Sequence, residues 1–399
     1  MPVWALLALA TATFMSVTIE MMPSGLMHLM SQELGVEHAQ IGNLVAIFAL
    51  TVVVTSTPLV LLLARVPKRI LLMLVLTLFA LGTIFTAFAP NYAMVVVSRI
   101  LTGIAHGVFW STVASYTATI VTPQQLMKAV SITSGGGSLA FVFGMPIGTF
   151  LGQALGWRTA FAALAVGCLV VVVILMLVLP STGVDEESAP TGALDTEAVA
   201  LALSASQHRL RLVVFVCVLT AVVMSAQYAF YSYTAPFLLD VVGVVQAQLP
   251  TWQFGYGIAA AIGTATTGIL FSARPRIGFY VTAALMLFGA GALALMPETQ
   301  LAALVGFVVW GAGMGFMPVL LQSRLLAVAS PKQRDFAAAL FNTGFNIGIS
   351  SGSFVGGVLL TDYGLRAPGM ALIALLIVAV LMAVVLDVRL AVREQAQRP

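Results

Sequence analysis

The sequence predicts an all-α membrane protein with twelve transmembrane helices in two pseudo-symmetric six-helix bundles. Three observations predict this fold. Of the 399 residues, 60% are hydrophobic and only 8% are charged, whereas an ordinary soluble domain contains about 25% charged residues. Polar and Pro/Gly-rich breaks divide the chain into apolar segments, and a helix needs about 20 such residues to cross the hydrocarbon. The second half of the chain also repeats the first.

The breaks predict twelve membrane spans and one long polar linker. The spans are 4–30, 40–64, 70–88, 93–121, 128–154, 159–180, 209–240, 250–273, 277–296, 299–329, 335–362 and 366–388. The linker, 181–208, holds five acidic residues among Ser, Thr, Gly and Ala. It separates an N-terminal bundle, 1–180, from a C-terminal bundle with a short tail, 209–399.

The basic residues predict the orientation. When the N-terminus is placed inside, 13 of the 17 Lys and Arg residues fall at cytoplasmic ends, and only Arg158 and Arg366 lie outside. This bias follows the positive-inside rule. We therefore expect a multi-pass protein of a bacterial inner membrane, with both termini and the linker in the cytoplasm.

The repeat has a constant offset of 208 residues. Gly144, Gly148 and Gly156 fall on glycines of the second half, and Thr122-Pro123 falls on Ser330-Pro331. Two halves with the same orientation imply a twofold pseudo-axis along the membrane normal, as in secondary transporters that hold their solute at the midplane between repeats. The alternative is a duplicated structural scaffold without a transport role.

Glycines at spacings of four residues recur in both halves. Such small residues let helices approach closely, so we expect these positions to serve helix packing rather than chemistry. The set is Gly144, Gly148, Gly152, Gly352 and Gly356.

Glu20 is the only charged residue between Trp4 and Met30. Its insertion costs about 2.5–3.5 kcal/mol on translocon scales, which points to a functional group. Ser16 and Ser24 share its helical face. Because desolvation disfavours a charged carboxylate, Glu20 could take and release a proton as access alternates. The alternative is a structural Glu that hydrogen-bonds a neighbouring helix.

The fourth predicted helix carries a second polar face, with Arg99, His106 and Trp110. Arg99 and Glu20 lie roughly 12 and 15 Å below the outer membrane surface at 1.5 Å per residue, so an ion pair between them is geometrically possible. Alternatively, Arg99 bonds backbone carbonyls. His106 either titrates near neutral pH or serves only as a packing residue. Trp110 either stacks on a solute, such as an aromatic drug or a sugar, or belongs to the core.

The polar helix faces of the second half contain no acidic residue at the membrane depth of Glu20. Asn342 and Asn346 share one helical face, and Gln227 and Tyr231 share another. These groups suit a hydroxyl-bearing solute but serve equally to hold helices together. The position equivalent to Glu20 is Tyr228, so we expect proton coupling to reside in the N-terminal half.

Three motifs resemble those of the major facilitator superfamily. They are EMMPSGL at 20–26, SRILTGIAHG at 98–107 and GMPIG at 144–148. With the two six-helix halves, they are most similar to the drug/proton antiporter branch, which includes arabinose-efflux, sugar-efflux and chloramphenicol-resistance permeases. The resemblance implies a role in proton transfer for Arg99.

The loop between the second and third helices departs from the superfamily pattern. Its basic residues Arg65, Lys68 and Arg69 remain where the resemblance implies a gating loop. The usual acidic residue and both glycines are missing, which removes the partners of a charge-pair lock.

The function that best fits these features is proton-coupled efflux of a small organic solute by alternating access, with Glu20 and Arg99 as the coupling residues. An uptake symporter or uniporter on the same scaffold is the alternative. A membrane enzyme or receptor is disfavoured because the four His residues lack metal-ligand spacing and the sequence has no P-loop. We expect no cofactor except the coupling proton, no metal, no nucleic acid and no obligatory protein partner.

Overall fold

The computed structural model describes residues 2–63, 65–122, 125–180, 207–329 and 334–396. Within these ranges the chain is helical without a strand, and twelve helices are long and apolar enough to span a membrane. The predicted all-α, twelve-helix fold is therefore confirmed. The expected linker lies outside the described residues, except for Gln207 and His208, which begin a helix.

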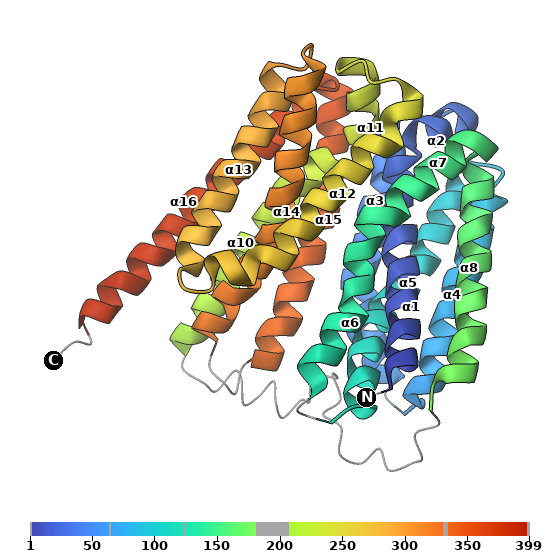
Figure 1. The fold of residues 1–399 in the computed structure, drawn as a ribbon, viewed down its shortest axis with the longest axis horizontal. Coiled ribbons are helices and arrows are strands. Elements are labelled where there is room, and N and C mark those ends of the chain that lie inside the picture. Colours follow the sequence, from blue (N-terminus) through green and yellow to red (C-terminus); the bar gives the residue numbers. More distant parts are fainter. Residues whose placement is uncertain (1, 64, 123–124, 181–206, 330–333, 397–399) are drawn as a thin grey trace.

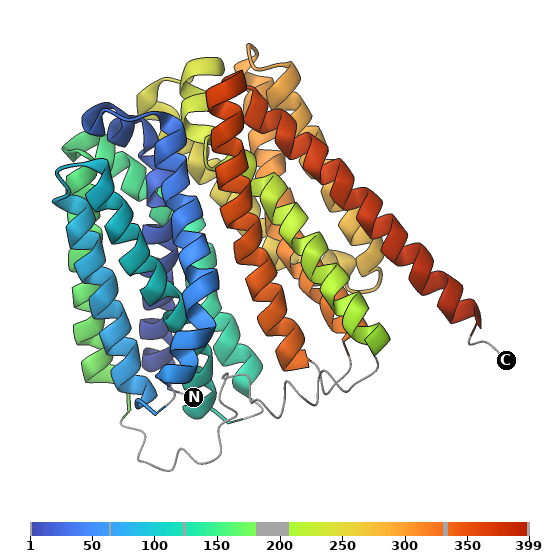
Figure 2. The same ribbon diagram turned by 180° about the vertical axis from the view of Figure 1, so that it is seen from behind.

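The N-terminal helices form one bundle in Figures 1 and 2 and the C-terminal helices form a second beside it. The first contains α1 (Val3–Gly25), α2 (Met27–Leu34), α3 (His38–Leu62), α4 (Lys68–Ala87), α5 (Tyr92–Thr119), α6 (Leu126–Leu139), the π-helix η2 (Ala140–Gly144), α7 (Met145–Leu155) and α8 (Trp157–Val178). The second contains α10 (Gln207–Tyr231), α11 (Thr234–Pro236), η3 (Phe237–Val241), η4 (Gln246–Gln248), α12 (Leu249–Phe271), α13 (Pro275–Leu295), α14 (Gln300–Val328), α15 (Arg334–Tyr363) and α16 (Ala367–Ala396).

The first helix of each half is interrupted, whereas the sequence predicted continuous spans over 4–30 and 209–240. The first breaks at Leu26, between α1 and α2, and the second breaks in the turn before α11. Under the offset of 208 residues these breaks nearly coincide. The repeat therefore extends to the backbone irregularities, which apolar periodicity does not reveal.

A π-helical turn interrupts the predicted span 128–154. Pro146 has no backbone N–H, so the carbonyl of Val142 cannot receive the usual helical hydrogen bond. The chain widens at this point, and the N–H of Met145 bonds to the carbonyl of Ala140, five residues back. Such π-bulges are common at functional sites.

The glycines lie where helices cross closely. A side chain added at Gly144, Gly148 or Gly152 would strike α1, at Thr18, Met22 and Leu26. One added at Gly352 or Gly356 would strike the backbone of α10. These glycines set the distance between the first and fifth helices of each half.

The two bundles contact each other from mid-depth to the end opposite the N-terminus. Gly257 of α12 lies against the Phe141 carbonyl, and the Ser350 hydroxyl donates to the Ala46 carbonyl at 3.0 Å. Further out, the Gln153 amide donates to the Gln246 carbonyl at 2.7 Å. In Figures 1 and 2 the bundles converge at this end and diverge at the end that carries the N-terminus.

We predict that Gly352→Ala destabilises the protein more than Gly148→Ala. The new methyl group at 352 would lie 2.5 Å from the Ser225 carbonyl oxygen, and backbone cannot move aside, whereas at 148 it meets the flexible end of Met22. Overpacking costs about 1–3 kcal/mol. Thermal unfolding in detergent should therefore show a clearly lower Tm for Gly352→Ala, and equal Tm values would contradict this account.

Candidate functional site

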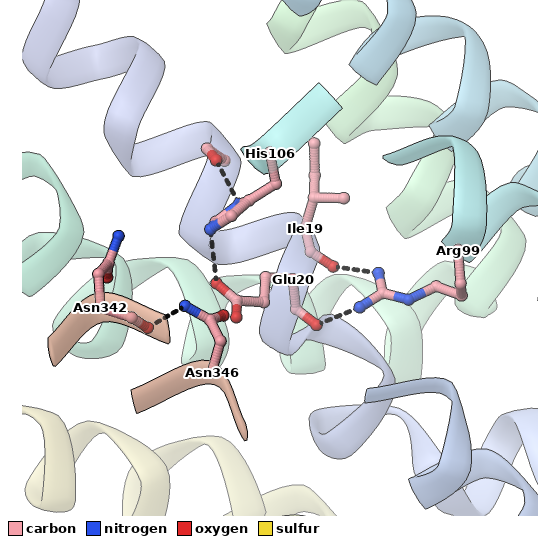
Figure 3. A network of polar contacts seen from close by, with 7 residues as sticks. Ile19, Glu20, Arg99, His106, Asn342 and Asn346 are labelled. Atoms are coloured by element: carbon pink, nitrogen blue, oxygen red, sulfur yellow. Dashed lines mark hydrogen bonds and ion pairs between the residues drawn. The ribbon is translucent and has the colours of Figure 1, made fainter. Parts of the chain in front are cut away.

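Glu20 lies at the centre of the molecule, on α1 and three residues before Pro23. Its side chain is buried, with 6% of the residue exposed. One carboxylate oxygen faces the Nε2 atom of His106 on α5 at 3.7 Å (Figure 3). That distance suits an ion pair when His106 is protonated, but it is longer than a hydrogen bond. The nearest titratable partner of Glu20 is thus a histidine.

His106 is held in place from several sides. Its Nδ1 atom lies 3.0 Å from the hydroxyl of Ser16, one turn before Glu20 on α1. Its ring packs edge-on against Phe48 at 5.0 Å between centroids. A neutral imidazole carries one N–H and one acceptor nitrogen. The side chains of Ser16, His106 and Glu20 therefore form a site for one proton. The tautomer of His106 decides which of its two ring nitrogens carries that proton.

Arg99 does not bond the Glu20 carboxylate in the described structure. Its guanidinium donates to the backbone carbonyls of Ile19 at 2.9 Å and Glu20 at 2.7 Å, as Figure 3 shows. It also stacks on Phe48, with its Cζ atom 4.3 Å from the ring centroid. Of the two arrangements that the sequence left open, an ion pair with Glu20 and an Arg bonded to backbone, the structure has the second.

The partner of Arg99 follows from Pro23. A proline cannot donate to the carbonyl four residues earlier, and for Pro23 that carbonyl belongs to Ile19. A free carbonyl within a membrane is costly, and the guanidinium supplies the missing donor. Arg99 therefore stabilises the part of α1 that presents Glu20, and it brings a fixed positive charge beside the carboxyl.

The other predicted wall residues lie on both sides of Glu20. Trp110 is half-buried and packs on His106 at 6.0 Å between ring centroids. In Figure 3, Asn342 and Asn346 of α15 are drawn on the carboxylate side of Glu20. The Asn346 amide donates to the Asn342 carbonyl at 3.0 Å, and Asn342 itself is exposed.

Gln227 belongs to an aromatic cluster in the C-terminal bundle. Its amide donates to the Tyr256 hydroxyl at 2.7 Å and accepts from the Trp310 indole at 2.8 Å. Tyr231 packs against Tyr256 and, across the bundle boundary, against Phe141. Gln227 therefore orients aromatic rings, and its contact with a solute stays a prediction.

Tyr228, at the position equivalent to Glu20, is also part of the centre. It is buried and lies within electrostatic range of the Glu20 carboxylate. The equivalent position thus holds an acid in one repeat and a phenol in the other, and both residues are buried.

The basic loop makes contacts within its own bundle. Arg69 donates to the Met176 carbonyl at the end of α8 at 2.7 Å, and Arg65 is exposed. Lys68 is half-buried at the start of α4. In this conformation the predicted gating loop ties α4 to α8 within the N-terminal bundle.

Sequence reasoning missed an ion cluster in the C-terminal bundle. Arg324 of α14 donates to both Asp387 oxygens of α16, at 2.9 and 3.1 Å, and the Tyr280 hydroxyl donates to the same carboxylate at 2.7 Å. Helical periodicity gives no signal for this pairing, because the three residues lie on different helices far apart in the chain. The cluster joins α13, α14 and α16.

Comparison with known proteins identifies the fold and the family. The family model described as Major Facilitator Superfamily matches residues 9–329. A bacterial homologue of the human lysosomal transporter Spinster, in an inward-facing and unoccupied conformation, is similar over 96% of both chains with 18% identity and a TM-score of 0.77. The nucleoside transporter NupG is similar over 96% of this chain and 98% of its own, with 14% identity and a TM-score of 0.76. At these identities the two structures support the fold alone.

We predict that Pro23→Ala reduces the destabilisation caused by Arg99→Met. Removing Arg99 leaves the Ile19 carbonyl without its donor, at a cost of about 1–3 kcal/mol. An alanine at 23 restores the N–H that can bond this carbonyl. Unfolding midpoints of the two single variants and the double variant should be non-additive, whereas additive effects would show that Arg99 is not the substitute for that N–H.

Proposed function

The chain belongs to the major facilitator superfamily, and from this premise we propose that it is a secondary active transporter that exports a small organic solute in exchange for inward-moving protons. Within the superfamily we place it in the drug/proton antiporter branch. A sugar or a drug is the class of solute that the branch suggests.

The observation that carries this proposal is the Glu20 carboxyl facing His106 between the bundles. The exposed fractions of the two side chains are only 7% for His106 and 8% for Glu20, yet they lie beside the polar amides of α15 (Figure 3). An acid inside a membrane is expensive and usually marks a proton or ion pathway. Glu20 is thus the proton carrier, and His106 is the group that exchanges the proton with it.

Arg99 acts as a positioning residue in this scheme. Its bonds to the Ile19 and Glu20 carbonyls hold the backbone of α1 below the carboxyl. Its charge also favours the ionised carboxylate, which opposes the effect of burial. The balance between these two effects lets Glu20 bind a proton on one side and release it on the other.

The conformation provides one state of the transport cycle. The positive-inside bias places the termini in the cytoplasm of a bacterial cell, so the bundles are in contact at the outer end and diverge toward the cytoplasm (Figure 1). Rocking of the bundles about the midplane would expose Glu20 to each side in turn. Trp110, Asn342 and Asn346 form the wall that a solute meets from the cytoplasm.

Glu20→Gln tests the proton-carrier role, because an amide keeps the shape of the side chain but cannot bind the proton. In proteoliposomes loaded with a panel of sugars and antibiotics, we expect the wild type to move its solute in response to an imposed pH gradient. The variant should lose that response while retaining solute exchange at equal pH.

Glu298→Gln is the matched control, because Glu298 is an exposed acid paired with Arg366 at 3.0 Å near the outer surface. It should couple like the wild type. If Glu20→Gln still follows the pH gradient, Glu20 is not the proton carrier. The direction of solute movement relative to the proton separates export from uptake on the same scaffold.

His106→Gln tests the partner of Glu20. Glutamine can still hydrogen-bond Ser16, but it cannot relay a proton. We expect pH-driven transport to slow by about 100-fold, the lower range for loss of a general acid–base group, while solute exchange without net proton movement stays near the wild-type rate. Equal slowing of both processes would indicate a structural role for His106.

A further inference from the structure

Three buried polar side chains lie near the boundary between the bundles, one turn beyond Glu20. They are Ser24 of α1, Thr149 of α7 and Gln253 of α12, with exposed fractions of 3%, 0% and 8%. Two come from the N-terminal bundle and one from the C-terminal bundle. We call them the Ser24–Thr149–Gln253 cluster.

Gly25 shows how closely the two bundles approach here. A methyl group placed on Gly25 would lie 2.5 Å from Thr149 Oγ1 and 3.5 Å from Gln253 Nε2. Hydroxyl and amide groups of opposite bundles therefore meet at one point on α1, next to Ser24. The point lies within the end at which the bundles are in contact.

The cluster is not satisfied by protein hydrogen bonds. Ser24 Oγ, Thr149 Oγ1 and Gln253 Oε1 have no partner among the residues that the structure describes. Most buried polar groups in proteins are hydrogen-bonded, and each exception requires an explanation. Leaving such a group without a partner costs free energy that contact with water would recover.

The repeat shows that the missing bond is specific to the N-terminal half. Ser232, the equivalent of Ser24, is 2.8 Å from the hydroxyl of Ser353 within its own bundle. The equivalent of Ser353 is Met145, which has no hydroxyl. Ser24 thus lacks the partner inside its bundle that Ser232 has, and it is adjacent in the chain to Gly25, where the two bundles meet.

We propose that the Ser24–Thr149–Gln253 cluster is the outer gate of the transporter and that its unsatisfied polar groups drive the gate toward opening. When the bundles separate at this end, the three groups gain hydrogen bonds to water or to a passing solute. The gate is then poised between closed and open states because apolar packing favours closure and the cluster opposes it.

This inference rests on the proposed function only for the rocking of the two bundles. It does not depend on Glu20 as the proton carrier. The gate proposal predicts that apolar side chains of similar shape at these positions stabilise the closed state. They remove the hydroxyl groups that need a hydrogen-bond partner.

The rate at which a thiol behind the gate is labelled from outside tests the proposal. Met21 follows Glu20 on α1, is 1% exposed, and packs in the hydrophobic cluster that joins Met145 to residues of the C-terminal bundle. Met21→Cys therefore serves as reporter, after the two buried native cysteines, Cys168 and Cys217, are replaced by alanine. A membrane-impermeant maleimide is added outside, without a pH gradient or solute.

We expect Thr149→Val and Ser24→Ala each to slow this labelling by about tenfold, the size expected for relief of one unsatisfied buried hydroxyl. Thr282→Val is the matched control, because Thr282 is equally buried and its hydroxyl also lacks a partner among the described residues, but it lies on α13 inside the C-terminal bundle. It should change stability and leave the labelling rate unchanged.

Unchanged or faster labelling in Thr149→Val and Ser24→Ala would overturn the proposal, since the cluster would then be satisfied in the closed state. Equal slowing by Thr282→Val would also overturn it, because the effect would not belong to the gate. A reporter that is never labelled would show that this end does not open. Failure of the proposed function would appear instead in the pH-gradient response of Glu20→Gln, with these rates unaffected.

Discussion

The bond between the Arg99 guanidinium and the Ile19 carbonyl is the interaction on which the central site depends. Pro23 creates the need for it, because proline removes the donor that this carbonyl would use in a regular helix. Within a membrane that need cannot be met by solvent. An arginine buried on α5 meets it and thereby fixes the part of α1 that carries Glu20. The functional acid is thus placed by a proline, an arginine and the backbone between them.

The two halves share a backbone plan but differ in the chemistry placed on it. Both have an interrupted first helix and glycines at the crossing with the fifth helix. At equivalent positions, however, one half has Glu20 where the other has Tyr228. The same asymmetry appears one turn further out, where Ser232 has a partner within its bundle and Ser24 does not. In the proposed function, duplication would supply the symmetric frame for rocking, and the asymmetry at two turns of α1 would supply the groups that make this motion respond to protons and solute.

Buried polar groups therefore occur in this protein in two ways. Most are satisfied, as in the bonds of Arg324 and Tyr280 to Asp387 that join three helices of the C-terminal bundle. Such clusters make each bundle rigid. Other buried polar side chains have atoms without a hydrogen-bond partner among the described residues, and of these Ser24, Thr149 and Gln253 lie near the boundary between the bundles. Alternating access requires rigid bundles and two conformations of similar free energy. Polar groups without hydrogen-bond partners at the boundary between the bundles keep the two free energies close.

The sequence by itself determined the membrane class, the twelve spans, the repeat and the identity of Glu20 as the exceptional charge. These properties depend on composition and on local periodicity, which need no tertiary contact. Only the tertiary structure decided the partners: His106 rather than Arg99 faces the Glu20 carboxylate, Gln227 orients aromatic rings, and Asp387 meets Arg324. Helical periodicity gives the face and depth of a residue but not the rotation of one helix against another. The choice between a carboxylate and a backbone carbonyl as the acceptor for Arg99 depends on that rotation, and so does the approach of Thr149 and Gln253 to Gly25, next to Ser24.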